Sequence, residues 1–197
     1  MSKARETKER IIKQAAELFN QQGYAGSSIS DIMRATQLQK GGIYNHFQSK
    51  QELALAAFDF ATAASSKRFL IAIKGKHNAV ERLQAILSVF RTFVDDPPLA
   101  GGCPILNTAI ESDDTNPALR DRVQKAMDTW RNLICRIINK GISQAEIRSN
   151  VEADTVATIM ISTLEGAVMM SKLYGNSIHI ERAINHLNDY IKNSLQV

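Results

Sequence analysis

Cysteine is scarce in this chain, and long apolar runs are missing. Only Cys103 and Cys135 occur in 197 residues, which is too few for a disulfide framework, and their spacing is not that of metal ligands. A reducing, cytoplasmic setting is the simplest expectation. No run of about 18 apolar residues occurs, and the N-terminus shows no apolar signal segment, so we expect no membrane partner.

Motifs of catalysis are also absent from the sequence. It has no glycine-rich phosphate loop, no nucleophile elbow and no His-Glu-x-x-His helix. The four histidines include His179 and His186, seven residues apart, without a cysteine or carboxylate at ligand spacing. We therefore expect no enzyme, no metal and no cofactor.

Helical periodicity runs through the whole chain, with 44% hydrophobic residues and no lasting strand alternation. An all-α fold of about nine helices follows. The first helix is expected to end near residue 23, and the next two to span 28–35 and 40–47. The fourth is expected to run from residue 50 to a break at 74–76. The remaining five are expected to cover 80–94, 104–112, 117–138, 152–174 and 180–195. In the first helix, Ile12, Ala15, Ala16 and Phe19 are expected to face inward.

Two sequence signals place helix starts with particular clarity. Ser28 with Asp31 three residues later is a capping-box pattern. Ser49 precedes the fourth helix as a favourable N-cap.

Positive charge is concentrated at the start of the chain. Residues 1–50 hold eight Lys or Arg against four Asp or Glu, whereas the 16 of each sign beyond residue 50 balance. Such a basic head on a neutral body suits a polyanion partner. A solvated basic helix explains the charge equally well.

Two short helices joined by the four-residue turn 36–39 predict a helix-turn-helix within this head. A helix that enters a major groove about 12 Å wide needs a small or polar leading face. Residues 40–42 and 44–46 provide one, while Ile43 and Phe47 are spaced to point inward.

The segment from Gln39 to Leu53, QKGGIYNHFQSKQEL, resembles the recognition-helix signature of the TetR family. Upstream, Gly23-Tyr24, Ser27-Ser28-Ile29 and Asp31-Ile32 resemble the same family's first two helices, so the likeness covers about residues 5–55. Three positions depart from it: Gln37 where glycine is common, Gln39 where serine is common, and Gly42 where a hydroxyl residue is common.

This resemblance implies a division into a DNA-binding domain at 1–49 and a ligand-binding and dimerisation domain at 50–197. It implies that Tyr44, His46 and Lys50 hold phosphates, with Ser27 and Ser28 at the start of the second helix. We assign base contacts to Lys40, which can donate to guanine, and Asn45, which can pair with adenine. Gly41 and Gly42 would allow close backbone approach. Tyr44 and His46 could instead only support the turn, Lys50 could be an ordinary first-turn lysine, and Asn45 could be solvated.

One head covers one half-site, so a homodimer is expected. The resemblance implies a four-helix bundle built from the last two helices of each copy. The predicted interface residues are Val156, Met160, Gly166, Ala167, Ile184, Leu187 and Ile191. A purely internal core is the alternative.

An effector pocket is predicted from soft apolar residues and the polar groups among them. Its predicted lining is Phe58, Phe90, Cys103, Asn107, Met127, Trp130, Met160, Thr163, Glu165 and Met169. These types at helical spacing are also ordinary core, and Cys103 could be a redox sensor or a plain buried thiol. The polar residues that could orient a ligand are Asn107, Glu111, Thr163 and Glu165. The lining favours an apolar effector.

These features predict a transcriptional repressor that binds a palindromic double-stranded operator as a dimer and is released by a small molecule. A ligand-independent regulator and an activator remain as alternatives. The effector, the operator and the regulated genes are not specified by the sequence.

Overall fold

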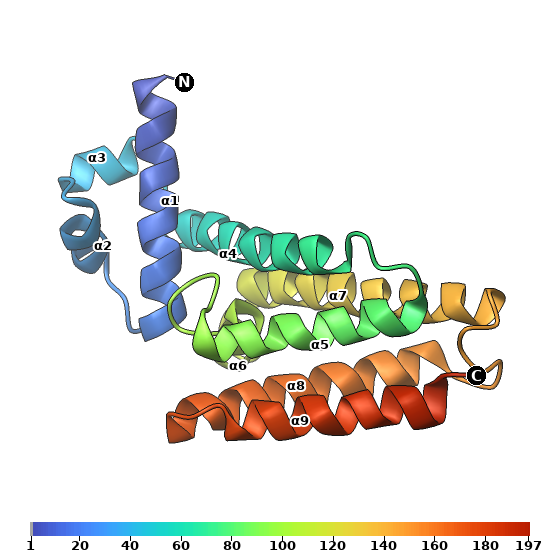
Figure 1. The fold of residues 1–197 in the computed structure, drawn as a ribbon. Helices are drawn as coiled ribbons and strands as arrows, with labels where there is room; N and C mark the ends of the chain where they lie inside the picture. Colours follow the sequence, from blue (N-terminus) through green and yellow to red (C-terminus); the bar gives the residue numbers. More distant parts are fainter. Residues whose placement is uncertain (1) are drawn as a thin grey trace. The chain divides into compact units, whose positions relative to one another are not determined.

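The computed structural model describes residues 2–197, and this part of the chain is helical apart from its loops and one isolated bridge (Figure 1). The prediction of an all-α fold of about nine helices is confirmed. The elements are α1 (Lys3–Gln22), α2 (Ile29–Thr36), α3 (Lys40–Tyr44), α4 (Lys50–Ile73), α5 (Ala79–Asp95), α6 (Pro104–Ser112), α7 (Pro117–Ser143), α8 (Ala153–Tyr174), α9 (Ile178–Tyr190) and the π-helical turn η1 (Ile191–Leu195).

The chain folds into two compact units whose boundaries fall inside α4 and α7. The first unit joins the residues up to Ala64 with Pro98–Lys125, and the second joins Ser65–Pro97 with Ala126–Val197. The three N-terminal helices, which we call the head, therefore share a unit with α6. The predicted functional boundary at residue 49 remains a prediction.

The core of the first unit is built on one face of α1. Ile11 and Ala15, four residues apart, are buried with Ile32 of α2 and Ile43 of α3. Figure 1 shows α2 and α3 beside α1. Ile12, which we expected to face inward, is only half-buried, because the buried stripe starts one residue earlier.

Local capping follows the sequence signals. The Ser28 hydroxyl accepts the amide of Asp31 at 3.2 Å, and the Asp31 carboxylate accepts the amide of Ser28 at 2.7 Å. Ser49 accepts the amide of Glu52 at 3.1 Å at the start of α4. The starts of α2 and α4 are thus fixed by side chains that satisfy amides lacking an intrahelical partner.

Helix α3, the predicted recognition helix, is shorter than expected: it ends at Tyr44, not at residue 47. The amide of His46 bonds to the carbonyl of Ile43, three residues back, at 3.0 Å. Such a tightened bond closes the helix, and two glycines in a five-residue helix favour an early end.

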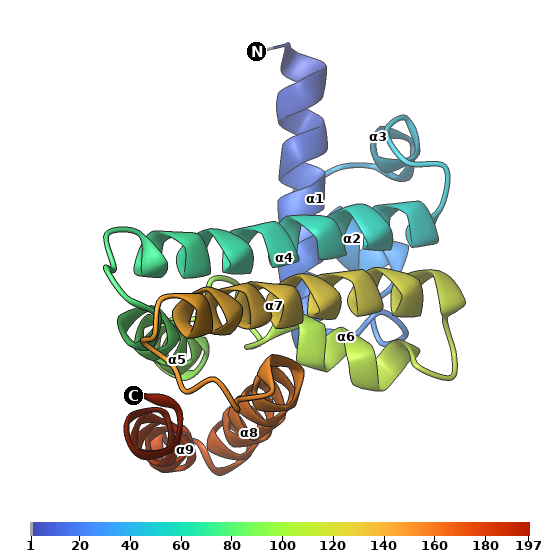
Figure 2. The same cartoon turned by 90° about the vertical axis from the view of Figure 1, so that its right-hand side faces the viewer.

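The second unit contains α5, α8 and α9 packed together, and Figure 2 shows α8 and α9 side by side. Phe69, Phe90, Phe93 and Trp130 form an aromatic cluster with ring centroids 4.9 to 6.3 Å apart. The last helix was predicted to run to residue 195, but it widens into a π-helical turn after Tyr190.

Helix α8 corrects the expectation that no segment is apolar enough to span a membrane. Its 22 residues include a window with a mean hydropathy of 1.3, which meets the length and composition of a membrane span. Half of that window is buried within the chain, as in a core helix. The other half leaves apolar side chains exposed.

Candidate nucleic-acid interface

Helix α3 presents a polar face to solvent and an apolar face to the core. Ile43 and Phe47 are 1% and 2% exposed, which confirms their predicted inward orientation. Lys40, Tyr44 and Asn45 are exposed, and the Lys40 ammonium lies 5.8 Å from the centre of the Tyr44 ring. These side chains are free to reach base edges or phosphates.

Neither glycine of α3 is required by the packing of the chain itself. A Cβ added at Gly41 would meet nothing within 4 Å, and one at Gly42 would make ordinary contact with Leu38 at 3.5 Å. Glycine costs a helix about 1 kcal/mol relative to alanine. The open space at Gly41 is therefore explained better by a surface that approaches from outside than by the fold.

The turn between α2 and α3 forms without the glycine that is common there. Gln37 adopts the left-handed conformation, with φ 56° and ψ 30°. Gln39, at the N-cap of α3, makes no side-chain capping bond. The backbone thus adopts the left-handed turn with a glutamine side chain, and α3 begins without a side-chain cap.

Lys50 is tied to the turn that follows α1. Its ammonium donates to the Tyr24 carbonyl and lies 4.1 Å from the centre of the Tyr24 ring. Partial burial lowers the pKa of Lys50, while the charges of Glu111 and Asp31 act in the opposite direction. This lysine is thus held in place at the edge of the head.

The other predicted phosphate residues differ in their exposure. Ser28 is exposed and caps α2, and His46 is half-buried. Ser27 is buried, and its hydroxyl donates to the Gly23 carbonyl at 2.7 Å. Within this structure Ser27 shapes the turn; its contact with DNA stays a prediction.

Sequence reasoning missed Asn20 and assigned Asn107 to the effector pocket. The Asn107 amide donates to the backbone carbonyl and side-chain oxygen of Asn20, both at 3.0 Å. Glu111, one turn further along α6, accepts backbone amides of the turn after α1. Polar residues four apart on the short helix were a signal, but their partners lie more than 80 residues away.

The residues predicted for the dimer interface lie mostly inside the chain. Val156, Met160, Ala167, Leu187 and Ile191 are buried, and Gly166 and Ile184 are half-buried. The exposed apolar residues of α8 follow another stripe, formed by Ile159, Met169, Met170, Leu173 and Tyr174.

The predicted pocket residues divide between the two units. Phe90 and Trp130 line a small apolar cavity in the second unit, with room for no more than about one water molecule. Phe58 lines a separate cavity in the first unit, together with Asn20 and Glu111. Neither cavity is lined by the other predicted residues: Cys103, Met160 and Glu165 are buried, Asn107, Met127 and Thr163 are half-buried, and Met169 is exposed.

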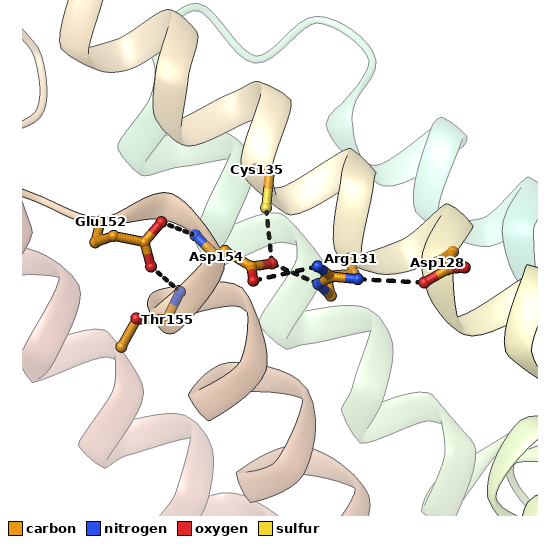
Figure 3. Close-up of polar contacts among 6 residues, drawn as sticks. All are labelled: Asp128, Arg131, Cys135, Glu152, Asp154 and Thr155. Carbon is orange, nitrogen blue, oxygen red and sulfur yellow. Dashed lines mark hydrogen bonds and ion pairs between the residues drawn. The ribbon is translucent and has the colours of Figure 1, made fainter.

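An ion-pair network joins α7 to the start of α8 (Figure 3). Arg131 bonds Asp154 through two nitrogens and Asp128 at 3.2 Å. The Cys135 thiol lies 3.9 Å from the same Asp154 carboxylate. Burial and the charge of Asp154 raise the pKa of Cys135, so the thiol stays protonated at neutral pH and is a poor nucleophile.

Comparison with known proteins agrees with this geometry. The family described as "Bacterial regulatory proteins, tetR family" matches residues 11–57, and "Tetracyclin repressor-like, C-terminal domain" matches residues 79–187. A TetR transcriptional regulator from Chloroflexus aurantiacus is similar over 100% of both chains, with 51% identity and a TM-score of 0.98. A TetR-family regulator from Cytophaga hutchinsonii is 33% identical, with a TM-score of 0.91 over 100% of this chain and 98% of its own. The HTH-type transcriptional repressor DhaR of Mycobacterium sp. (strain GP1) is 24% identical over 86% of this chain and 84% of its own length.

Proposed function

Because this chain belongs to the tetR family of bacterial transcriptional regulators, we propose that it is a homodimeric repressor of a palindromic operator, released by a small apolar effector. The observation that carries the DNA-binding part is the exposed polar face of α3, with open space at Gly41. The "Tetracyclin repressor-like" description of the C-terminal match and the name of the DhaR relative support repression. The operator lies on cytoplasmic DNA, so the protein acts in the cytoplasm.

In this proposal Lys40 and Asn45 read base edges, and Tyr44, His46, Lys50 and Ser28 hold phosphates. The side chains that read bases set the sequence preference, while phosphate contacts set position and salt dependence.

The test is selection of bound sequences from a pool of random duplex DNA. Wild-type protein is expected to enrich a palindrome, and Lys40→Ala and Asn45→Ala are expected to relax it at one position of each half-site, at a cost of about 1–3 kcal/mol. Lys140→Ala, at an exposed lysine on α7, is the charge-matched control. Absence of any enriched sequence with the wild type would refute sequence-specific binding.

The dimer is proposed to form through the exposed face of α8, where small residues lie between the exposed apolar ones. Ile159, Ser162, Gly166, Met169 and Leu173 follow one another at alternating steps of three and four residues, the spacing of a helix-packing seam. A Cβ added at Gly166 would meet nothing within 4 Å in the single chain. Small residues in the middle of an exposed apolar stripe suit close approach by the same helix of a second copy.

The effector is proposed to enter the apolar cavity of the second unit. Phe69, Ile86, Phe90, Trp130, Leu133, Ile134 and Ile161 line it, with no charged group among them. In this structure the cavity has room for no more than about one water molecule. The effector should therefore be a small, uncharged aromatic or aliphatic molecule that pushes the lining side chains apart as it enters.

Trp130 is the only tryptophan in the chain and therefore reports on this cavity. Titration with toluene is expected to change its fluorescence and to weaken binding to the selected duplex. Ile161→Phe, which fills the cavity, should abolish both responses. A fluorescence change with unaltered DNA affinity would favour a ligand-independent regulator. Transcription assays in which the operator is moved relative to the promoter distinguish repression from activation.

A further inference from the structure

Two side chains one turn apart on α6 hold the end of α1 and the turn that follows it. The two carboxylate oxygens of Glu111 accept consecutive backbone amides, from Tyr24 and from Ala25, each at 2.7 Å. Charged acceptors make stronger hydrogen bonds than neutral ones. One half-buried carboxylate thus satisfies two amides of an irregular turn.

Asn107 and Asn20 make further hydrogen bonds between the same two elements. The Asn107 amide donates to Asn20 and, at 2.9 Å, to the Gly101 carbonyl. The Asn20 amide donates in return to the carbonyls of Ala100 and Gly102, at 2.9 and 3.1 Å. The last turn of α1 is therefore fixed to the loop before α6 as well as to α6 itself.

Two glycines allow this close fit. A Cβ on Gly23 would lie 2.9 Å from a Glu111 carboxylate oxygen, and Gly23 has a φ of +78°. A Cβ on Gly101 would lie 2.5 Å from the Asn20 carbonyl oxygen, at a φ of +109°. Both backbones approach too closely for any other residue to be accommodated without a shift.

The turn that Glu111 holds adjoins the groups proposed to face DNA. The Lys50 ammonium donates a hydrogen bond to the Tyr24 carbonyl, and the Ser27 hydroxyl donates one to the Gly23 carbonyl. Ser28, directly after, caps α2. The charge of Glu111 also favours the charged form of Lys50. The turn that Glu111 holds is thus hydrogen-bonded to Lys50 and to Ser27, the residue before the N-cap of α2.

We propose that Glu111, supported by Asn107, is a positioning residue for operator binding: its carboxylate holds the turn after α1 so that α2, Lys50 and the recognition helix meet DNA in one arrangement. The inference rests on the proposed operator binding. Simple electrostatics predicts that removal of a negative charge near a DNA-binding surface strengthens DNA binding. A positioning role for Glu111 predicts the opposite, namely that removal of its charge weakens DNA binding.

The experiment compares Glu111→Gln with Asp114→Asn, which removes the same charge from an exposed residue three positions away. The probe is the duplex that wild-type protein enriches from random DNA. Glu111→Gln is expected to weaken binding at least fivefold, since its amide nitrogen cannot accept a backbone N–H. Asp114→Asn should bind equally or more tightly. Glu111→Asp, which keeps the charge but withdraws the oxygens, should also weaken binding.

Hydrogen exchange provides a readout that a general loss of stability would not mimic. The amides of Tyr24 and Ala25 should exchange at least tenfold faster in Glu111→Gln, while those of α8 keep their wild-type rates. Equal DNA binding by Glu111→Gln and Asp114→Asn overturns the inference, as does unchanged exchange at the turn. A wild-type protein that enriches no duplex instead refutes operator binding itself, which is a different result.

Discussion

At the scale of single residues, Gly41 separates the needs of the fold from those of the function. Alanine at this position has room in the isolated chain and is the better helix former, by about 1 kcal/mol. We expect Gly41→Ala to keep or slightly raise the unfolding free energy in urea while weakening operator binding, because the added methyl group meets the duplex. A variant that binds DNA as tightly as the wild type would show that the open space at Gly41 is not used.

Four carboxylates at helix starts give the protein a predictable acid sensitivity. The pKa values of Asp31, Glu81, Glu152 and Asp154 are lowered, by the Ser28 side chain, the His77 amide, Thr155 and Arg131 respectively. In the folded protein these carboxyl groups take up protons only at a lower pH than in the unfolded chain. Their contribution to the unfolding free energy is therefore present above about pH 4 and is lost as the pH falls further.

Urea unfolding between pH 5 and pH 3 measures this loss directly. Asp154→Asn is expected to flatten the pH dependence relative to wild type, because one proton-linked group has been removed. Asp189→Asn, at an exposed position on α9, is the control. An identical pH dependence in Asp154→Asn and wild type would contradict the role of the Arg131 pair.

At the scale of elements, the loop before α6 depends on backbone conformation. Gly75 and Gly101 both have a positive φ, but a Cβ at Gly75 meets nothing, whereas one at Gly101 meets the Asn20 carbonyl. Gly75→Ala should cost about 1 kcal/mol, from conformation alone. Gly101→Ala should cost at least about twice as much in urea unfolding, because a close contact adds to the same conformational strain. Equal costs would mean that the loop shifts without penalty.

Local elements could be predicted from the sequence, whereas their long-range partners could not. Ser28 with Asp31 and Ser49 with Glu52 are determined within four residues, and the inward spacing of Ile43 and Phe47 is likewise local. The contacts of Asn107 and Glu111 join segments 86 or 87 residues apart, and no periodicity encodes such a pairing. The sequence pattern placed Met160 and Leu187 at the dimer interface, but both side chains are buried within the single chain.

At the scale of the whole molecule, dimerisation and DNA binding should be lost together. Met169, 47% exposed in the middle of the α8 stripe, should be buried by the second copy. Met169→Glu would place two charges in an apolar seam, so sedimentation should detect monomers at micromolar concentration, with operator affinity reduced at least tenfold. Ile110→Glu, at a residue 65% exposed on α6, is the matched control and should remain dimeric. A dimeric Met169→Glu would move the interface elsewhere.

The first compact unit is assembled from two stretches of chain separated by more than thirty residues. When only the first 64 residues have left the ribosome, the three helices of the head have been synthesised. Leu99, which packs in the core of the head, and Glu111, which holds the turn after α1, have not. Folding of the head is therefore completed late in synthesis. Prematurely terminated products would carry an incompletely ordered head, and such fragments should compete poorly with the finished protein for its DNA.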